Sequence, residues 1–115
     1  MATAHAKLTN LRISARKVRL VADTIRGKRV AEARDMLRFT VKGCAEPMRK
    51  LLESAAANAD QAASEKRERL NTDDMVITKI MVNEGRTLNR FWSGPRGRAM
   101  RIRKRGSHIE LTIAG

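Results

Sequence analysis

The amino-acid sequence predicts an α+β fold, in which three helices come first and a long β-hairpin follows. The spacing of apolar residues supports this order. They recur every three or four residues up to position 63 and alternate with a period of two from Met75 onward. Helices followed by strands are typical of α+β domains. Because 115 residues are enough for a modest core, we expect one domain over residues 1–115.

Residues 3–9 are a weak strand candidate, and the first helix begins after them at Ser14. The Ser14 hydroxyl can cap free amide groups, and Gly27 stands where a left-handed residue would end the helix. The inward positions are Val18, Val21, Ala22 and Ile25. On the other side lie Arg16, Arg19, Asp23 and Arg26, with Lys17, Lys28 and Arg29 nearby. This stripe is either a first cationic surface or a solvated helix face on which Asp23 pairs with Arg19.

Two further helices are expected before the strands. The second covers about residues 30–39, and the third has Pro47 in its first turn, where proline is tolerated. Val30, Ala33 and Leu37 face inward on the second helix. The third presents one apolar face for four turns, made of Met48, Leu51, Leu52, Ala55, Ala56, Ala59, Ala62 and Ala63. The later half of this face is alanine, so its packing partner must approach closely. Residues 64–74 are a polar connection.

Two alternating segments complete the predicted fold. In the first, the shared face is formed by Val76, Thr78, Ile80 and Val82, although Ile77 and Met81 make the other face partly apolar. In the second, Ile109, Leu111 and Ile113 alternate with polar residues, as in a half-buried strand. Counting back from Ile109 in steps of two, the same face of the strand would carry Arg105, Arg103 and Arg101. A strand whose inward face changes from aliphatic to arginine has left the core.

The predicted hairpin carries the most informative charge pattern of the chain. Residues 86–105 hold eight Lys and Arg residues and no Asp or Glu. The net charge of +13 is divided into +7 for residues 1–29, zero for 30–83 and +6 for 84–115. Arginine suits phosphate because its planar group donates two parallel hydrogen bonds and stays charged. The hairpin therefore indicates contact with a nucleic acid, although a solvated charge run is the alternative.

Geometry places this cationic segment outside the folded body. If residues 75–92 pair with 97–113, the arms beyond Glu84 and Gly106 project roughly 25–30 Å at about 3.3 Å per residue. A two-stranded ribbon is marginally stable in water, so we expect it to be mobile when free and ordered when bound. Phe91 and Trp92 lie beside the predicted turn. We expect them to stack on bases or pack into another protein rather than into the core.

Other functional classes find little support. His5 and His108 have no second type of metal ligand near them in sequence, so we expect no metal site. The sequence has no Gly-rich phosphate loop and no pair of acidic residues in a plausible pocket. We therefore expect no cofactor and no catalytic residues. Cys44 is the single cysteine of the sequence, which excludes an internal disulfide. Its position beside a helix start could lower the pKa of its thiol, but the role of a small buried residue is favoured. We expect no membrane span and no export signal, and an organellar presequence stays open.

Three stretches resemble a known family. They are SARKVRLVADTIRGK from Ser14, KLLESAAANA from Lys50 and GRAMRIRKRGSHI from Gly97. In this order and spacing they are similar to the large ribosomal subunit protein twenty-two (L-twenty-two) family in its bacterial-sized form, from about Leu11 to Ile113. The resemblance implies three helices packed on a small three-stranded antiparallel sheet, with a long protruding β-hairpin at 84–106. It also implies a structural, non-enzymatic protein that binds large-subunit ribosomal RNA, supports subunit assembly and lines the peptide exit tunnel with its hairpin.

The resemblance also implies which residues make these contacts. At the helix start, RNA would be faced by Ser14, Arg16, Lys17 and Arg19. Along the hairpin it would be faced by Arg86, Arg90, Arg98, Arg101, Arg103, Lys104, Arg105, Ser107 and His108. The tunnel tip would consist of Phe91, Trp92, Gly94, Pro95 and Arg96. Two positions depart from many family members: Ala15 replaces a proline after the capping serine, and the stretch 92–95 replaces a more cationic one.

The implied partners are ribosomal RNA, neighbouring ribosomal proteins and, at the tip, the nascent polypeptide. We expect a monomer outside the ribosome and a location on cytoplasmic ribosomes, with an organellar ribosome left open. Composition alone also allows an architectural DNA-binding protein with basic β-arms, which would usually be a dimer. A third class, an enzyme acting on nucleic acid, would need an acid–base or metal constellation.

Overall fold

The computed structural model describes residues 2–115 and has an α+β architecture. The helices are α1 (Ala15–Ile25), α2 (Val30–Phe39) and α3 (Ala45–Glu65). The strands are β1 (Thr3–Leu11), β2 (Val76–Glu84), β3 (Leu88–Ser93), β4 (Ala99–Lys104) and β5 (Ser107–Ala114). Two short 3-10 turns are η1 (Thr72–Asp74) and η2 (Pro95–Gly97). The predicted fold class is therefore confirmed.

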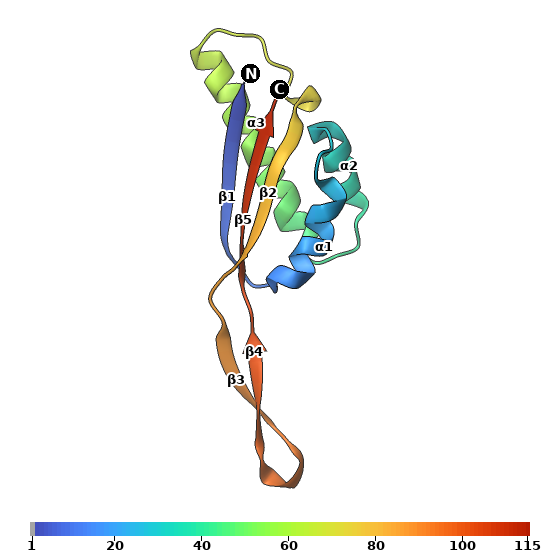
Figure 1. The fold of residues 1–115 in the computed structure, drawn as a ribbon, viewed down its shortest axis with the longest axis vertical. Coiled ribbons are helices and arrows are strands. Elements are labelled where there is room, and N and C mark those ends of the chain that lie inside the picture. Colours follow the sequence, from blue (N-terminus) through green and yellow to red (C-terminus); the bar gives the residue numbers. More distant parts are fainter. Residues whose placement is uncertain (1) are drawn as a thin grey trace.

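The helices cover one face of a three-stranded antiparallel sheet, whose strand order is β1-β5-β2. Strands β3 and β4 form a second, two-stranded antiparallel sheet. Figure 1 shows this ribbon continuing the direction of β2 and β5 and projecting away from the helices. The molecule measures 67 × 25 × 16 Å along its principal axes, so the ribbon makes it strongly elongated.

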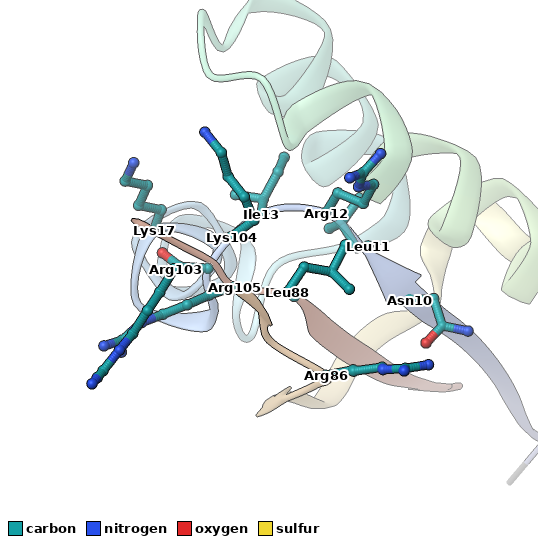
Figure 2. Close-up of a pocket in the computed structure, with 12 residues that line it drawn as sticks. Asn10, Leu11, Arg12, Ile13, Lys17, Arg86, Leu88, Arg103, Lys104 and Arg105 are labelled. Atoms are coloured by element: carbon teal, nitrogen blue, oxygen red, sulfur yellow. The ribbon is translucent and has the colours of Figure 1, made fainter. Parts of the chain in front are cut away.

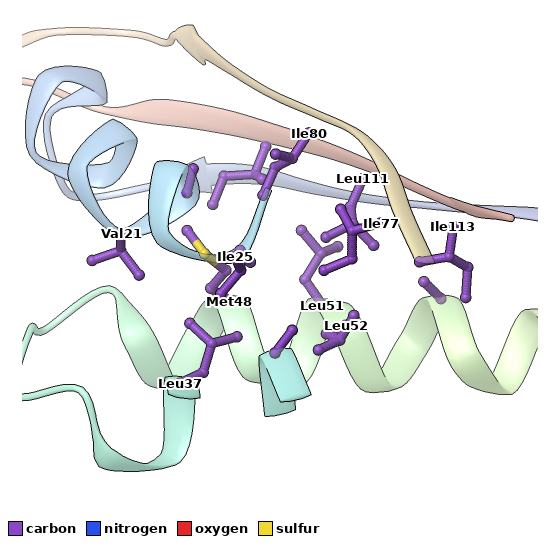
Figure 3. Close-up of a cluster of buried hydrophobic side chains, with 14 of the residues drawn as sticks. Val21, Ile25, Leu37, Met48, Leu51, Leu52, Ile77, Ile80, Leu111 and Ile113 are labelled. Carbon is purple, nitrogen blue, oxygen red and sulfur yellow. The ribbon is translucent and has the colours of Figure 1, made fainter. Parts of the chain in front are cut away.

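The core lies between the helices and the sheet, and β5 runs through its centre. Ile109, Leu111 and Ile113 alternate inward from β5 and are at most 1% exposed. Leu52 on α3 is completely buried opposite them, as Figure 3 shows. The alanine half of α3 packs near β1, where the small side chain of Ala4 is also buried. Close approach of these two elements is possible because neither presents a large side chain there.

One position on α3 was predicted wrongly. Ala62 is exposed, whereas Ala63 is buried. The buried face advances by four residues from Ala59 to Ala63 at its end, which turns position 62 toward solvent. The other predicted inward positions of the three helices are buried.

Strand β2 changes its buried parity in the middle. Ile77 pairs with Ile113, but Lys79 pairs with Thr112, so the register shifts between them. Such a β-bulge puts one extra residue into β2 and reverses which side chains face the core. Ile77 and Ile80 are consequently both buried, and the prediction that Val76 and Thr78 lie on the same side as Ile80 and Val82 is wrong.

The ends of α1 are only partly as predicted. Gly27 has the expected left-handed φ of +77°, and its amide donates to the Ile77 carbonyl over 3.2 Å. Ser14 precedes the helix, but its hydroxyl makes no capping hydrogen bond within the described chain. Instead the Ser14 backbone carbonyl accepts the amides of Lys17 and Val18, both at 3.1 Å. The predicted hydroxyl cap is therefore wrong, although the helix start is right.

The two ladders of the hairpin are separated by a break in register. Between β2 and β3 lie residues 85–87, whereas only residues 105–106 lie between β4 and β5. The Gly85 amide donates to the Gly106 carbonyl over 2.9 Å at this point. A Cβ on Gly106 would lie 2.9 Å from the Arg86 carbonyl oxygen and 3.3 Å from that of Leu11. Three chain segments thus meet here at a distance that only glycine permits.

We expect Leu52→Ala to lower the free energy of unfolding by about 2–5 kcal/mol, because it opens a cavity in the centre of the core. Leu20→Ala is the matched control, since Leu20 on α1 is 61% exposed and its truncation leaves no cavity. Urea unfolding followed by circular dichroism measures both values. Equal losses for the two variants would contradict this description of the core.

Candidate nucleic-acid interface

The cations of the hairpin have no acidic partners. Ion pairs elsewhere join Lys7 to Glu110, Arg26 to Asp23, and Arg49 to Glu46. Within residues 2–115, none involves the eight cationic side chains of positions 86–105. All eight residues are exposed. Their positive charges therefore repel one another and are balanced only by solvent ions in the free protein.

The electrically neutral middle of the chain differs from the hairpin, because some of its cations have acidic partners. Arg34 on α2 donates from Nε to Glu53 Oε1 on α3 over 2.6 Å, and from Nη1 to Asp73 Oδ1 in η1 over 3.0 Å. Partial burial opposes its charge, but these two partners raise the pKa of Arg34 above its usual value. These side chains link three elements, whereas those of the hairpin remain available.

The β3–β4 ribbon has two chemically different faces. Directly paired residues share a face, and faces alternate along each strand. One face carries Leu88, Arg90 and Trp92 opposite Lys104, Ile102 and Met100. The other carries Asn89, Phe91 and Ser93 opposite Arg103, Arg101 and Ala99. The first face is therefore a mainly apolar stripe with cations, and the second has two adjacent arginines beside an aromatic ring.

Phe91 and Trp92 are 74% and 67% exposed, which confirms that neither packs into the core. They lie on opposite faces of the ribbon, close to the turn formed by residues 94–98. Arg96 and Gly97 adopt left-handed φ angles of 59° and 71° in this turn. A Cβ on Gly94 would lie 2.6 Å from Met100 Cγ, so glycine allows Met100 to fold over the turn. In Figure 1 this turn is the end of the molecule farthest from the helices.

At the hairpin root, the ribbon, the connection between β1 and α1, and the first turn of α1 line an open pocket of about 990 Å³ (Figure 2). It is lined by Asn10, Leu11, Arg12, Ile13, Ser14, Lys17, Arg86, Leu88, Arg103, Lys104, Arg105 and Gly106. Six of these residues are cationic and none is acidic. The pocket thus brings together Ser14 and Lys17, predicted at the helix start, with four of the predicted hairpin cations. We call it the root pocket.

Sequence reasoning missed six residues of the root pocket, namely Asn10, Leu11, Arg12, Ile13, Leu88 and Gly106. Arg12 could have been found, because it lies two residues before Ser14 in the basic N-terminal segment. Asn10 could not, because its role depends on tertiary geometry. It has a left-handed φ of 59°, and its amide donates to His108 Nδ1 over 3.0 Å. Arg16 lines a smaller hollow of about 310 Å³ that also includes Arg105 and Thr87.

Two arginines of the α1 stripe make bonds within the protein. Arg19 donates from Nε and Nη2 to the Val82 carbonyl over 3.2 and 2.9 Å. Arg26 donates to the Ile80 carbonyl over 2.8 Å, and it, rather than Arg19, pairs with Asp23. Because β2 is an edge strand, these bonds satisfy carbonyls that would otherwise be open to another strand. An RNA contact by Arg19 stays a prediction, but its guanidinium already has a structural task.

Ser107 and His108 lie where the hairpin joins the body. Ser107 is completely buried, and its hydroxyl has no hydrogen-bond partner among residues 2–115. An RNA contact through this side chain would therefore require local opening of the structure. His108 is half-buried and holds the Asn10 amide, which positions the connection between β1 and α1. Its contact with RNA also stays a prediction.

Other kinds of site find no geometric support in the described residues. No group of three or more His, Cys, Asp and Glu side chains lies close enough to hold a metal within residues 2–115. Cys44 is buried, and burial raises the pKa of its thiol, so the alternative of a lowered pKa is wrong. None of the helices described is long and apolar enough to cross a membrane.

Together these features define a small α+β protein with a protruding cationic ribbon, a class typical of nucleic-acid binding. The family model described as Ribosomal protein L22p/L17e matches residues 6–114, and the chain belongs to this family. It is therefore a structural protein of the large ribosomal subunit, and its family is not one of enzymes. The resemblance inferred from three sequence stretches is confirmed.

The two arginines Arg16 and Arg19 provide a test of how α1 divides its tasks. Arg19→Ala removes two hydrogen bonds to the β2 edge, and we expect it to cost about 1 kcal/mol of stability. Arg16→Ala should leave stability unchanged, because the Arg16 side chain has no hydrogen bond or ion pair within the described chain. Thermal unfolding of the free proteins measures both. Unchanged stability of Arg19→Ala, or an equal loss for Arg16→Ala, would contradict a structural role for the bonds of Arg19.

Proposed function

We propose that this protein binds large-subunit ribosomal RNA through its hairpin and root pocket, and so supports subunit assembly. The observation that carries the proposal is the run of eight exposed hairpin cations without a single ion pair in the described chain. RNA backbone supplies phosphates at regular intervals, and arginine binds them through two parallel hydrogen bonds. Residues 1–115 act in this proposal as one RNA-binding domain.

In this proposal the arms and the tip of the hairpin contact different partners. The arms of the ribbon carry Arg101 and Arg103 on one face and Arg90 and Lys104 on the other, so both faces can meet phosphate. The tip, with Phe91, Trp92, Gly94, Pro95 and Arg96, forms part of the wall of the peptide exit tunnel and meets the nascent chain. The protein is a monomer before assembly, and it joins neighbouring ribosomal proteins on cytoplasmic ribosomes.

An architectural DNA-binding protein is the second candidate, because exposed apolar residues at the tip of basic arms can wedge between base pairs. Membership of a ribosomal protein family argues against it. Sedimentation of the native protein with large subunits after a high-salt wash distinguishes the two, since a DNA-binding protein would not sediment with them.

We expect binding of the free protein to large-subunit ribosomal RNA to depend steeply on salt. Contact with about six to eight phosphates gives a slope of log K against log salt of roughly −5 to −7. The double variant Arg101→Gln, Arg103→Gln should make this slope shallower by about 2. Its matched control, Lys66→Gln with Arg69→Gln in the connection after α3, should leave the slope unchanged. A wild-type slope shallower than about −2 would contradict the proposal.

The position of the tip is tested by photo-crosslinking in ribosomes that hold a stalled nascent chain. Gly94 is unsuitable for the crosslinking residue, because a side chain there would collide with Met100 and the Arg98 carbonyl. We therefore place it at Arg96, which is exposed in the turn, and at Arg103 in the arm. Arg96 should label the nascent peptide and Arg103 should label RNA. The reverse pattern would refute the assignment of the tip.

A further inference from the structure

The root pocket differs from the rest of the cationic surface because its floor is apolar. Leu11, Ile13 and Leu88 line it and are each half-buried. Leu11 and Ile13 pack against the core from their inner sides, so their outer sides remain open to the pocket. Figure 2 shows Leu88 below the connection between β1 and α1, which carries Leu11 and Ile13. Arg86 lies on one side of Leu88, and Lys17, Arg103 and Arg105 lie on the other. An apolar floor inside a cationic rim fits a ligand that combines an apolar surface with negative charge.

Paired RNA backbone does not fit this description. In a duplex the phosphates and sugars lie outside and the bases are stacked inside, so a helix would touch only the cationic rim. A nucleotide that has left its helix offers the required combination. It carries a flat base with weakly solvated faces, and a phosphate on each side. A pocket of about 990 Å³ lies in the range that accommodates a bound small molecule.

We propose that the root pocket holds one unpaired nucleotide of RNA, with its base over Leu11, Ile13 and Leu88. The two flanking phosphates bind cations on opposite sides of Leu88, namely Arg86 on one side and Lys17 with Arg105 on the other. This inference rests on the RNA-binding function proposed above and specifies the RNA: a bulged or looped nucleotide at the hairpin root rather than a continuous helix.

The part of the pocket that the body contributes, at the junction with the hairpin, holds its shape before any RNA is bound. Gly106 permits the Arg86 and Leu11 carbonyls to approach closely, and His108 fixes Asn10 in its left-handed conformation. The register break leaves Arg86 and Arg105 outside both ladders, where their side chains can turn toward the pocket. Because these features belong to the free protein, less conformational entropy is lost when the nucleotide binds.

An apolar side chain of a neighbouring protein is the other possible occupant of such a floor. The rim argues for the nucleotide, because none of the twelve lining residues is acidic and all charged ones are positive. A protein segment would have to bring several acidic residues beside its apolar anchor. Capture of a protein at this position is therefore an outcome that would overturn the proposal.

Photo-crosslinking in assembled large subunits gives the direct test. A photoreactive residue replaces Leu88 in one preparation and Arg101 in the middle of the arm in another. Sequencing of reverse-transcription stops identifies the labelled nucleotide, and chemical probing of protein-free ribosomal RNA, in which no pocket shields the base, reports whether that base is paired. We expect Leu88 to label one nucleotide that is unpaired. Labelling of paired nucleotides or of protein from Leu88, while Arg101 labels RNA, would overturn the proposal and leave RNA binding intact. Absence of RNA labelling from both positions would refute RNA binding as well.

A pair of substitutions separates the floor from the rim. Leu88→Ala should weaken binding of the free protein to large-subunit RNA about fivefold without changing the salt slope, because it removes only apolar contact. Arg105→Gln should make the slope shallower by about 1. Val41→Ala, at a fully exposed position between α2 and α3, is the matched control and should leave affinity unchanged. In assembled subunits, Leu88→Ala should also restore chemical reactivity to the labelled base. If that base stays protected and affinity is unchanged, the floor does not hold it.

Circular dichroism shows whether Leu88→Ala has folded, and we expect it to have folded because Leu88 lies in the ribbon, outside the buried core. The crosslinking outcome does not depend on this variant.

Discussion

Uncompensated positive charge in the hairpin is the constraint on which the arrangement of this molecule depends. Every cation of residues 86–105 is exposed, and none has an acidic partner in the described chain. A ribbon of two strands gains little from burial, and mutual repulsion weakens it further. We therefore expect the hairpin to obtain most of its order from a polyanion outside the protein, whereas the body is held by its own core. Assembly with RNA completes the fold in this account.

The body must nevertheless aim the hairpin, and it does so through a few contacts at the root. Gly85 and Gly106 carry the last backbone hydrogen bond between the arms before the register break. His108 and Asn10 attach the neighbouring connection, which brings α1 alongside. On the far side of β2, Arg19 and Arg26 bind edge carbonyls and tie α1 to the sheet. A shift of α1 would consequently move the cationic rim that it shares with the hairpin.

Periodicity in the sequence was enough to predict the elements and the place where the last strand leaves the core. Burial alternates along β5 with Ile109, Leu111 and Ile113 inside, as this periodicity predicts. It failed in β2, because the bulge after Ile77 depends on pairing with β5, which the sequence of β2 alone does not reveal. Charge spacing likewise identified the cations but not their partners. Arg19 bonds to the sheet edge, and Asn10 reaches the root pocket only through tertiary geometry, which its position in the sequence does not reveal.

Amide hydrogen exchange tests the central claim most directly, because it measures the stability of the hairpin and of the body in the same sample. In the free protein, we expect the Ile102 amide in β4 to exchange almost as fast as in an unfolded chain, while the Leu111 amide in β5 exchanges only through global unfolding. In the assembled large subunit both should be protected. Equal protection of Ile102 and Leu111 in the free protein would contradict the account, because the hairpin would then be stabilised by the protein itself.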